Sequence, residues 1–344
     1  MKKTLFITLA SIALVSCSQD ETVATMDRVA IAFDKVFVEN STSSRAAEDI
    51  TLDKLNNFSV YGSVVKGDQE GNIFDEQKVE KTAGGYTYSP AQYWIPGAIY
   101  HFTAIAPHEG YWIYTCKPGT ESEYGTRQAQ FGTITFDNEE AAAEQDLLWA
   151  YQKSSTEETI PDAVRFTFLH MLSRAKFTFV NDFEVGSNIS LKIRDVKILN
   201  AHKTGTLELQ GEEAPAVQWI AEGTFEKAFG NTTQEEAQAP TKSASTVHYY
   251  LLPVADATYN IEFTIDLYQA GVLLSGEGIK KESTITISDM KRGYSYDFKA
   301  KLSASNTMNE GALEPIEFKV SGVKAWDEDI NGDGIVDEND KVNF

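Results

Sequence analysis

Residues 164–168 read Val-Arg-Phe-Thr-Phe and residues 176–180 read Lys-Phe-Thr-Phe-Val, so apolar and polar side chains alternate in both. This alternation is typical of half-buried strands, because successive side chains of a strand point to opposite faces of its sheet. The same pattern recurs in residues 101–105, 189–196, 259–267, 283–287 and 316–320. Many short strands without helices between them predict an all-β fold of antiparallel β-sandwiches.

Glycine and proline residues separate these strands and mark the expected turns, at Gly84-Gly85, Pro96-Gly97, Pro118-Gly119, Gly186-Ser187, Gly205, Gly271 and Arg292-Gly293. Residues 138–148 differ, since their Glu-Glu-Ala-Ala-Ala-Glu stretch predicts a short helix. A domain boundary is expected near residues 169–173. It divides a first sandwich, residues 49–171, from a second sandwich, residues 172–323.

The N-terminus has the form of a secretory signal, residues 1–16, that ends at a lipoprotein cleavage site. Lys2 and Lys3 precede an apolar run that closes in Leu-Val-Ser before Cys17. The run is shorter than the roughly 20 residues of a transmembrane helix. Cleavage would leave Cys17 to carry acyl chains such as palmitate, which tether the protein to a membrane. The alternative is an ordinary signal peptide with an incidental cysteine.

A leader, residues 17–48, follows the signal. It begins with Ser-Gln-Asp-Glu at residues 18–21, which resembles the acidic signals that send Bacteroidetes lipoproteins to the surface of the outer membrane. An apolar strand is expected over residues 29–38, before a polar stretch of small residues that contains Arg45 and Ala46. An exposed basic residue in such a stretch is a protease site. A flexible tether is the alternative.

Composition excludes some classes of function. The chain has 30 basic and 51 acidic side chains, a formal net charge of -21, and nucleic acid requires the opposite sign. With Cys17 lipidated, Cys116 has no partner for a disulfide within the chain. The histidines, His101, His108, His170, His202 and His248, lack metal-ligand spacing, and no nucleophile or phosphate-binding motif is present. We therefore expect a protein that is not an enzyme.

A motif in the acidic tail, residues 324–344, matches a 12-residue calcium loop. Gly334 stands at position 6, where the loop must turn sharply. The expected oxygen ligands are Asp329, Asn331, Asp333, the carbonyl of Ile335, Asp337 and Asp340. The sequence thus predicts a bound, structural Ca²⁺, although Asp340 replaces the usual glutamate. A solvated acidic tail is the alternative, which leaves the two glycines unexplained.

Two groups of aromatic residues admit two interpretations. They are Tyr86, Tyr88, Tyr93 and Trp94, and then Tyr111, Trp112 and Tyr114. On a sandwich surface they would stack on sugar rings. Alternating aromatics in strands more often form core contacts or cross-strand pairs.

The chain resembles the fimbrillin (Mfa-like) lipoproteins of Bacteroidetes, which are subunits of protease-matured type V pili. The resemblance rests on short motifs in a fixed order, at residues 58–62 (Phe-Ser-Val-Tyr-Gly), 93–96, 100–107, 146–150 (Asp-Leu-Leu-Trp-Ala), 166–173, 251–253 and 291–296. It implies two tandem transthyretin-like antiparallel β-sandwich domains, and a surface or fimbrial location. Its partners would be other pilus subunits, the outer membrane through lipid, and a host protein or glycan receptor.

The resemblance also implies donor-strand exchange, in which a protease cuts after an arginine and a strand of the next subunit fills the groove left behind. Here residues 29–38 would be the removable strand, Arg45 the cut site and residues 316–320 the donor. The calcium loop departs from the family pattern and leaves shaft, tip and anchor roles open. A surface lipoprotein that does not polymerise and binds host or dietary glycans remains the alternative function.

Overall fold

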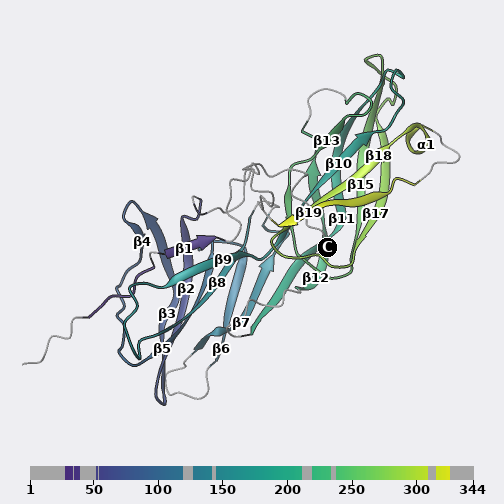
Figure 1. Ribbon diagram of the computed structural model, residues 1–344. Helices are drawn as coiled ribbons and strands as arrows, with labels where there is room; N and C mark the ends of the chain where they lie inside the picture. The colour runs from purple at the N-terminus through teal and green to yellow at the C-terminus, as the bar shows by residue number, and fades with distance from the viewer. Residues whose placement is uncertain are drawn as a thin grey trace, which may run out of the picture.

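The computed structural model describes residues 28–33, 35–38, 52, 54–118, 127–141, 145–210, 219–233, 238–308 and 315–325, and their strands form three sheets (Figure 1). The first sheet consists, in spatial order, of β1 (Lys35–Val38), β9 (Arg165–His170), β8 (Leu148–Ser155), β5 (Ile99–Ala106), β2 (Asn57–Lys66), β3 (Gln69–Thr82) and β4 (Gly85–Thr87).

The middle sheet consists of β16 (Val272–Leu273), β15 (Ala257–Gln269), β11 (Ile189–Gln210), β7 (Arg127–Asp137) and β6 (Trp112–Pro118), with β12 (Ile220–Gly230) paired to β11 and β17 (Ile279–Ile287) paired to β15. The third sheet consists of β13 (Ser243–Ser245), β10 (Ser173–Asn181), β18 (Tyr294–Leu302) and β19 (Phe318–Ala325), with β14 (Tyr249–Leu251) on β10. A short helix, α1 (Ala304–Thr307), follows β18.

The long strand β11 connects the two lobes seen in Figure 1. Its 22 residues extend for roughly 70 Å when fully stretched. The N-terminal half pairs with β15 through residues 189–198, and the C-terminal end pairs with β7 through residues 204–210. The middle sheet therefore belongs to both lobes, and residues on both sides of position 171 contribute to it.

Each half of the middle sheet packs against a different partner sheet. Ile105 and Trp149 of the first sheet share an apolar cluster with Ile134 and Leu207 of the middle sheet. In the other lobe, a second cluster joins strands of the middle sheet to β10, β18 and β19. A third cluster lies in the first lobe and contains Phe58, Phe102 and Phe166 together with residues of the 28–38 segment.

The all-β prediction is confirmed, but not every strand pair is antiparallel. Two strand pairs are parallel rather than antiparallel: β1 with β9, and β10 with β18. Both pairs join segments far apart in the sequence, so no hairpin imposes the antiparallel direction on them. The division into two transthyretin-like domains at residues 171 and 172 stays a prediction.

The prediction of a helix over residues 138–148 is wrong. Residues 138–141 form a turn, and Leu148 begins β8. The Oδ1 atom of Asp137 accepts hydrogen bonds from the backbone N–H groups of Glu139 and Glu140, at 3.1 and 3.0 Å. These bonds close a turn directly after β7.

The prediction of a turn at Gly205 is also wrong, because Gly205 lies inside β11. A β-carbon at this position would come within 2.7 Å of side-chain carbons of Leu252 and Trp219. The glycine is therefore explained by close packing against these two side chains rather than by a turn.

Candidate functional site

Residues 28–33 and 35–38 belong to a segment that is inserted into the apolar interior of the first lobe. Ile31 and Phe33 are 2% and 0% exposed, and Val36 and Val38 are also buried. Full burial of an aliphatic or phenyl side chain contributes about 1.5–3 kcal/mol, so these four side chains together contribute on the order of 10 kcal/mol. A segment of this length is therefore a major part of the core that it enters.

Phe33 occupies the centre of an aromatic cluster. Its ring is stacked on that of Phe166, with centroids 5.7 Å apart and an interplanar angle of 13°. Four more rings lie at centroid distances of 5.4 to 6.3 Å, those of Phe58, Phe74, Tyr88 and Phe102. These rings come from β2, β3, β5 and β9 and from the loop after β4, so residues from most of the first sheet form the pocket of this one side chain.

Main-chain hydrogen bonds hold the segment on both sides. The N–H of Ile31 donates to the carbonyl of Gln92 at 2.9 Å, and the N–H of Trp94 donates to the carbonyl of Val29 at 3.0 Å. On the other side, the N–H of Val164 donates to the carbonyl of Ala32 at 2.8 Å. The segment is thus bound by contacts that any extended chain can make, and its side chains decide how well it fits.

β1 completes this attachment as the outermost strand of the first sheet. It pairs parallel to β9, with Val36 opposite Phe166 and Val38 opposite Phe168. On its outer face Phe37 is 55% exposed. Without residues 28–38, the edge of β9 would present unpaired N–H and C=O groups beside an open apolar groove, a surface that accepts an added strand.

The segment expected to be the donor is seated in the second lobe. Ile316 and Phe318 are 6% and 8% exposed and belong to the core of that lobe. The Phe318 ring lies 5.5 to 6.0 Å, centroid to centroid, from the rings of Phe177, Phe179 and Phe263. β19 pairs antiparallel to β18 and ends the strand order of the third sheet.

Several site residues predicted from the sequence lie outside the described residues. They are Cys17 for lipidation, Arg45 and Ala46 for processing, and the calcium ligands Asp329, Asn331, Asp333, Ile335, Asp337 and Asp340. Within the described ranges, no group of three or more histidine, cysteine or acidic residues is arranged to hold a metal ion. The same ranges contain no helix that is long and apolar enough to cross a membrane.

The tryptophans of the two aromatic groups belong to the core. Trp94 is 4% exposed and packs edge-on against Tyr100, with ring centroids 4.8 Å apart. Trp112 is 8% exposed, and its indole N–H donates to the carbonyl of Pro107 at 2.9 Å. Tyr93 and Tyr111 are about half exposed, at 41% and 47%. Neither indole therefore offers a free ring face to a sugar.

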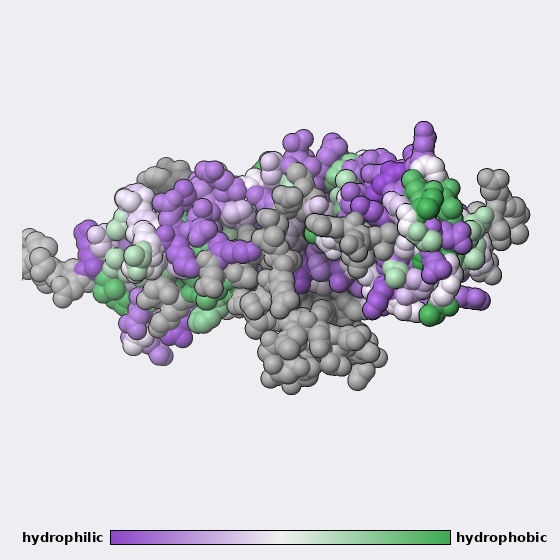
Figure 2. All heavy atoms as spheres, turned by 90° about the horizontal axis from the view of Figure 1, so that it is seen from above, coloured by the Kyte–Doolittle hydropathy of each residue, from purple (hydrophilic) through white to green (hydrophobic). Residues whose placement is uncertain are grey.

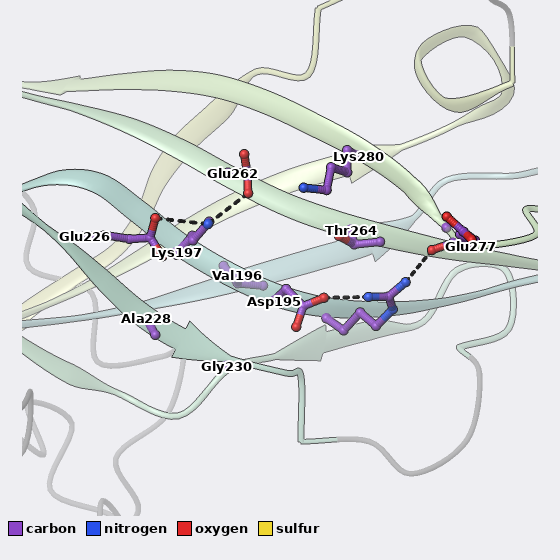
Figure 3. A pocket seen from close by; sticks show the side chains of 12 residues that line it. Asp195, Val196, Lys197, Glu226, Ala228, Gly230, Glu262, Thr264, Glu277 and Lys280 are labelled. Atoms are coloured by element: carbon purple, nitrogen blue, oxygen red, sulfur yellow. Dashed lines mark hydrogen bonds and ion pairs between the residues drawn. The ribbon is translucent and has the colours of Figure 1, made fainter.

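A charged pocket of about 590 Å³ lies on the middle sheet in the second lobe, beside the bulge of β11 at residues 194–197 (Figure 3). Arg194 pairs with Asp266 and Asp195, at 3.1 and 2.5 Å. Lys197 pairs with Glu226 and Glu262, both at 3.0 Å. Hydrogen bonds to these carboxylates raise the pKa of Arg194 and of Lys197. The charges of these two side chains are balanced within the pocket wall.

Two buried polar pairs were not foreseen from the sequence. His170 Nδ1 lies 2.8 Å from Asp146 Oδ2, and both side chains are almost fully buried. Lys227 is 2% exposed, and its Nζ donates to Asn138 Oδ1 at 2.8 Å. Burial lowers the pKa of the Lys227 ammonium to about 7. No local sequence pattern predicts such pairs, because tertiary packing brings together residues that are far apart in the sequence. The separation is 24 positions for the first pair and 89 for the second.

A solved structure of low sequence identity shares this fold. A fimbrial protein from Bacteroides vulgatus aligns with a TM-score of 0.56 and 14% identity, over 85% of this chain and 99% of that one. A cell adhesion protein described as putative, from Bacteroides uniformis, aligns with a TM-score of 0.45 and 15% identity, over 88% and 99% of the two chains. The fimbrial anchor protein Mfa2 from Porphyromonas gingivalis gives a TM-score of 0.36 and 11% identity, over 85% and 98%.

Comparison with families of sequences gives a more specific result. No curated protein matches the chain. The fimbrillin-like family, in contrast, matches residues 44–320, which is most of the sequence. The chain therefore belongs to the fimbrillin-like family.

Proposed function

We propose that this protein is a structural, adhesive subunit of a surface pilus, exported as an outer-membrane lipoprotein and assembled by donor-strand exchange. The observation that supports this proposal best is the insertion of residues 28–38 in the first lobe, ahead of Arg45 in the sequence. Cleavage between Arg45 and Ala46 would separate this segment from the rest of the chain. The emptied groove would then bind residues 316–320 of another subunit.

The surface of the described chain suits a protein that must not aggregate before it is processed. Among the coloured residues of Figure 2, hydrophilic ones predominate and apolar side chains form separate patches. Ile31, Phe33, Val36 and Val38 of the inserted segment are buried, and Ile316 and Phe318 of the donor are seated in their own lobe. Both assembly surfaces are thus closed in the uncut chain.

An arginine-specific protease tests this function on the lipid-free mature chain. We expect a new N-terminus at Ala46, identified by mass spectrometry, together with a ladder of oligomers that resist heating in detergent. The Arg45→Ala variant should stay monomeric under the same protease. Arg28→Ala is the matched control, since it removes an arginine on the other side of the inserted segment and should still assemble. Cleavage at Arg45 without oligomers would contradict a polymerising role.

Lipid attachment and location are tested in cells. Metabolic labelling with palmitate should mark the wild-type protein and fail on Cys17→Ser. Electron microscopy with antibody labelling would then place the protein on filament shafts, on filament tips or at the filament base. Label spread over a bare outer membrane, with no filaments that depend on the protein, would instead favour a surface lipoprotein that does not polymerise.

A further inference from the structure

The inserted segment and the donor segment share a three-residue pattern. Residues 31–33 read Ile-Ala-Phe, and residues 316–318 read Ile-Glu-Phe. In both, the isoleucine and the phenylalanine are buried while the residue between them is not. The two phenylalanines are each surrounded by other phenyl rings, Phe33 in the first lobe and Phe318 in the second.

This shared pattern matters because the groove is selective at these two positions. The Phe33 pocket is formed by five aromatic rings and leaves no exposed part of the side chain. A smaller side chain would leave a cavity there, and a polar one would bury an unpaired group. An occupant must therefore present an aromatic residue at this point, and the position of Ile31, two residues before it, is buried as well.

We propose that the donor strand binds in one register, in which Ile316 of one subunit takes the place of Ile31 in the next subunit and Phe318 takes the place of Phe33. This inference rests on the proposed function and specifies its partner, a second copy of this chain. The donor would run parallel to β9, as β1 does. Phe318 would then stack on Phe166 as Phe33 does in the uncut chain.

Where the donor follows the path of residues 35–38, the register places further residues. Val323 falls at the position of Val38, so a third apolar residue is matched. Ser321 falls at the position of Val36, which makes this the least filled part of the groove. Val320 takes the position of Lys35, which is directly opposite Arg165 on β9. A shift of two residues would instead bring Val320 opposite Thr167.

The occupied groove explains why exchange would need cleavage. Ile316 and Phe318 already occupy a buried aromatic site in their own lobe, so they gain a similar environment when they move. With residues 28–38 in place the receiving groove is filled, and the donor has no vacant site to enter. Removal of those residues leaves a groove whose Ile and Phe pockets match a segment of every other subunit.

Engineered disulfides distinguish the two registers. In the lipid-free mature chain with Cys116→Ser, one variant carries Arg165→Cys and Val320→Cys, and the control carries Thr167→Cys and Val320→Cys. All three positions have exposed side chains, so the substitutions spare the core. Directly opposed residues on neighbouring strands lie about 5 Å apart. A shift of two residues separates them to about 8 Å, beyond the roughly 7 Å that a disulfide spans.

After treatment with the arginine-specific protease, a non-reducing gel should show disulfide-linked oligomers for the 165 and 320 pair. The 167 and 320 pair should give at most a tenth of that yield. Oligomers that cross-link mainly through the 167 and 320 pair, or through neither pair, would overturn the register and leave strand exchange itself intact. Cleavage at Arg45 with no oligomers in either variant would overturn the proposed function and the register together.

Discussion

The ring of Phe33 lies stacked on the ring of Phe166, with centroids 5.7 Å apart, although 133 residues separate them in the sequence. Phe33 belongs to the short inserted segment and Phe166 to β9, the strand against which β1 pairs. The contact therefore joins the N-terminal segment to the body of the first lobe. Its strength decides how firmly the segment is held.

Phe33→Ala should lower the free energy of unfolding of the first lobe by about 3–5 kcal/mol, the usual cost of emptying a buried phenyl pocket. Urea unfolding followed by tryptophan fluorescence measures this loss. The matched control is Phe37→Ala, four residues along the same segment but 55% exposed, which should change stability by less than about 0.5 kcal/mol. Equal effects of the two substitutions would show that the segment is not anchored by the Phe33 pocket.

Much of the fold follows from local patterns, whereas the contacts of the site do not. Alternation placed β5, β9, β10, β15 and β17 correctly, because alternate residues of each enter an apolar core. The apolar residues of the 29–38 segment predicted a strand, of which the structure has the part in β1. Its parallel pairing with β9 and the ring of Phe166 beside Phe33 were not predictable, since both arise from pairing between distant segments.

The length of β11 is not predictable from its local sequence, for a related reason. A glycine within a run of alternating residues usually marks a turn or a bulge, so the pattern predicts a turn at Gly205. In the fold its missing side chain makes room for Leu252 and Trp219. Close approach of this kind depends on residues 14 and 47 positions away, so the local sequence does not distinguish the two uses of glycine.

Gly205→Ala tests this explanation. The added methyl group would meet Leu252 and Trp219 at 2.7 Å, so we expect a loss of about 1–3 kcal/mol in the free energy of unfolding. Gly71→Ala in β3 is the control, because the nearest atom to its added methyl group is a side-chain carbon of Val64 at an ordinary 3.6 Å. If chemical denaturation finds the two variants equally stable, close packing does not explain Gly205.

The loop motif at residues 329–340, from which calcium binding is expected, gives a prediction about metal binding. Isothermal titration of the metal-free chain with Ca²⁺ should show one site, and Asp333→Ala with Asp337→Ala should abolish the heat of binding. Because a bound ion stabilises the state that binds it, Ca²⁺ should also slow proteolysis near the C-terminus. Glu139→Ala, an acidic substitution far from the loop in sequence, should bind as the wild type does. No heat of binding in the wild type would favour a solvated acidic tail.

Lys227 gives a prediction about pH. Burial lowers its pKa from 10.5 to about 7, so between these values the unfolded chain binds a proton that the folded chain has released. The free energy of unfolding should therefore rise with pH in this window, by about 2 kcal/mol between pH 7 and pH 9 from this one group. Below pH 7 both states hold the proton, and this contribution to the slope disappears.

Urea unfolding of the wild type and of Lys227→Met across pH 6 to 9 measures that contribution as the difference between their slopes. The variant also removes the partner of Asn138 Oδ1, which shifts its stability by an amount that does not depend on pH in this range. Lys203→Met is the matched control. Lys203 lies on the surface, and its hydrogen bond to Glu139 raises its pKa, so its proton is retained throughout the window. Parallel curves for the wild type and Lys227→Met would mean that Lys227 stays charged in the folded chain, and that its bond to Asn138 is a charge-assisted one.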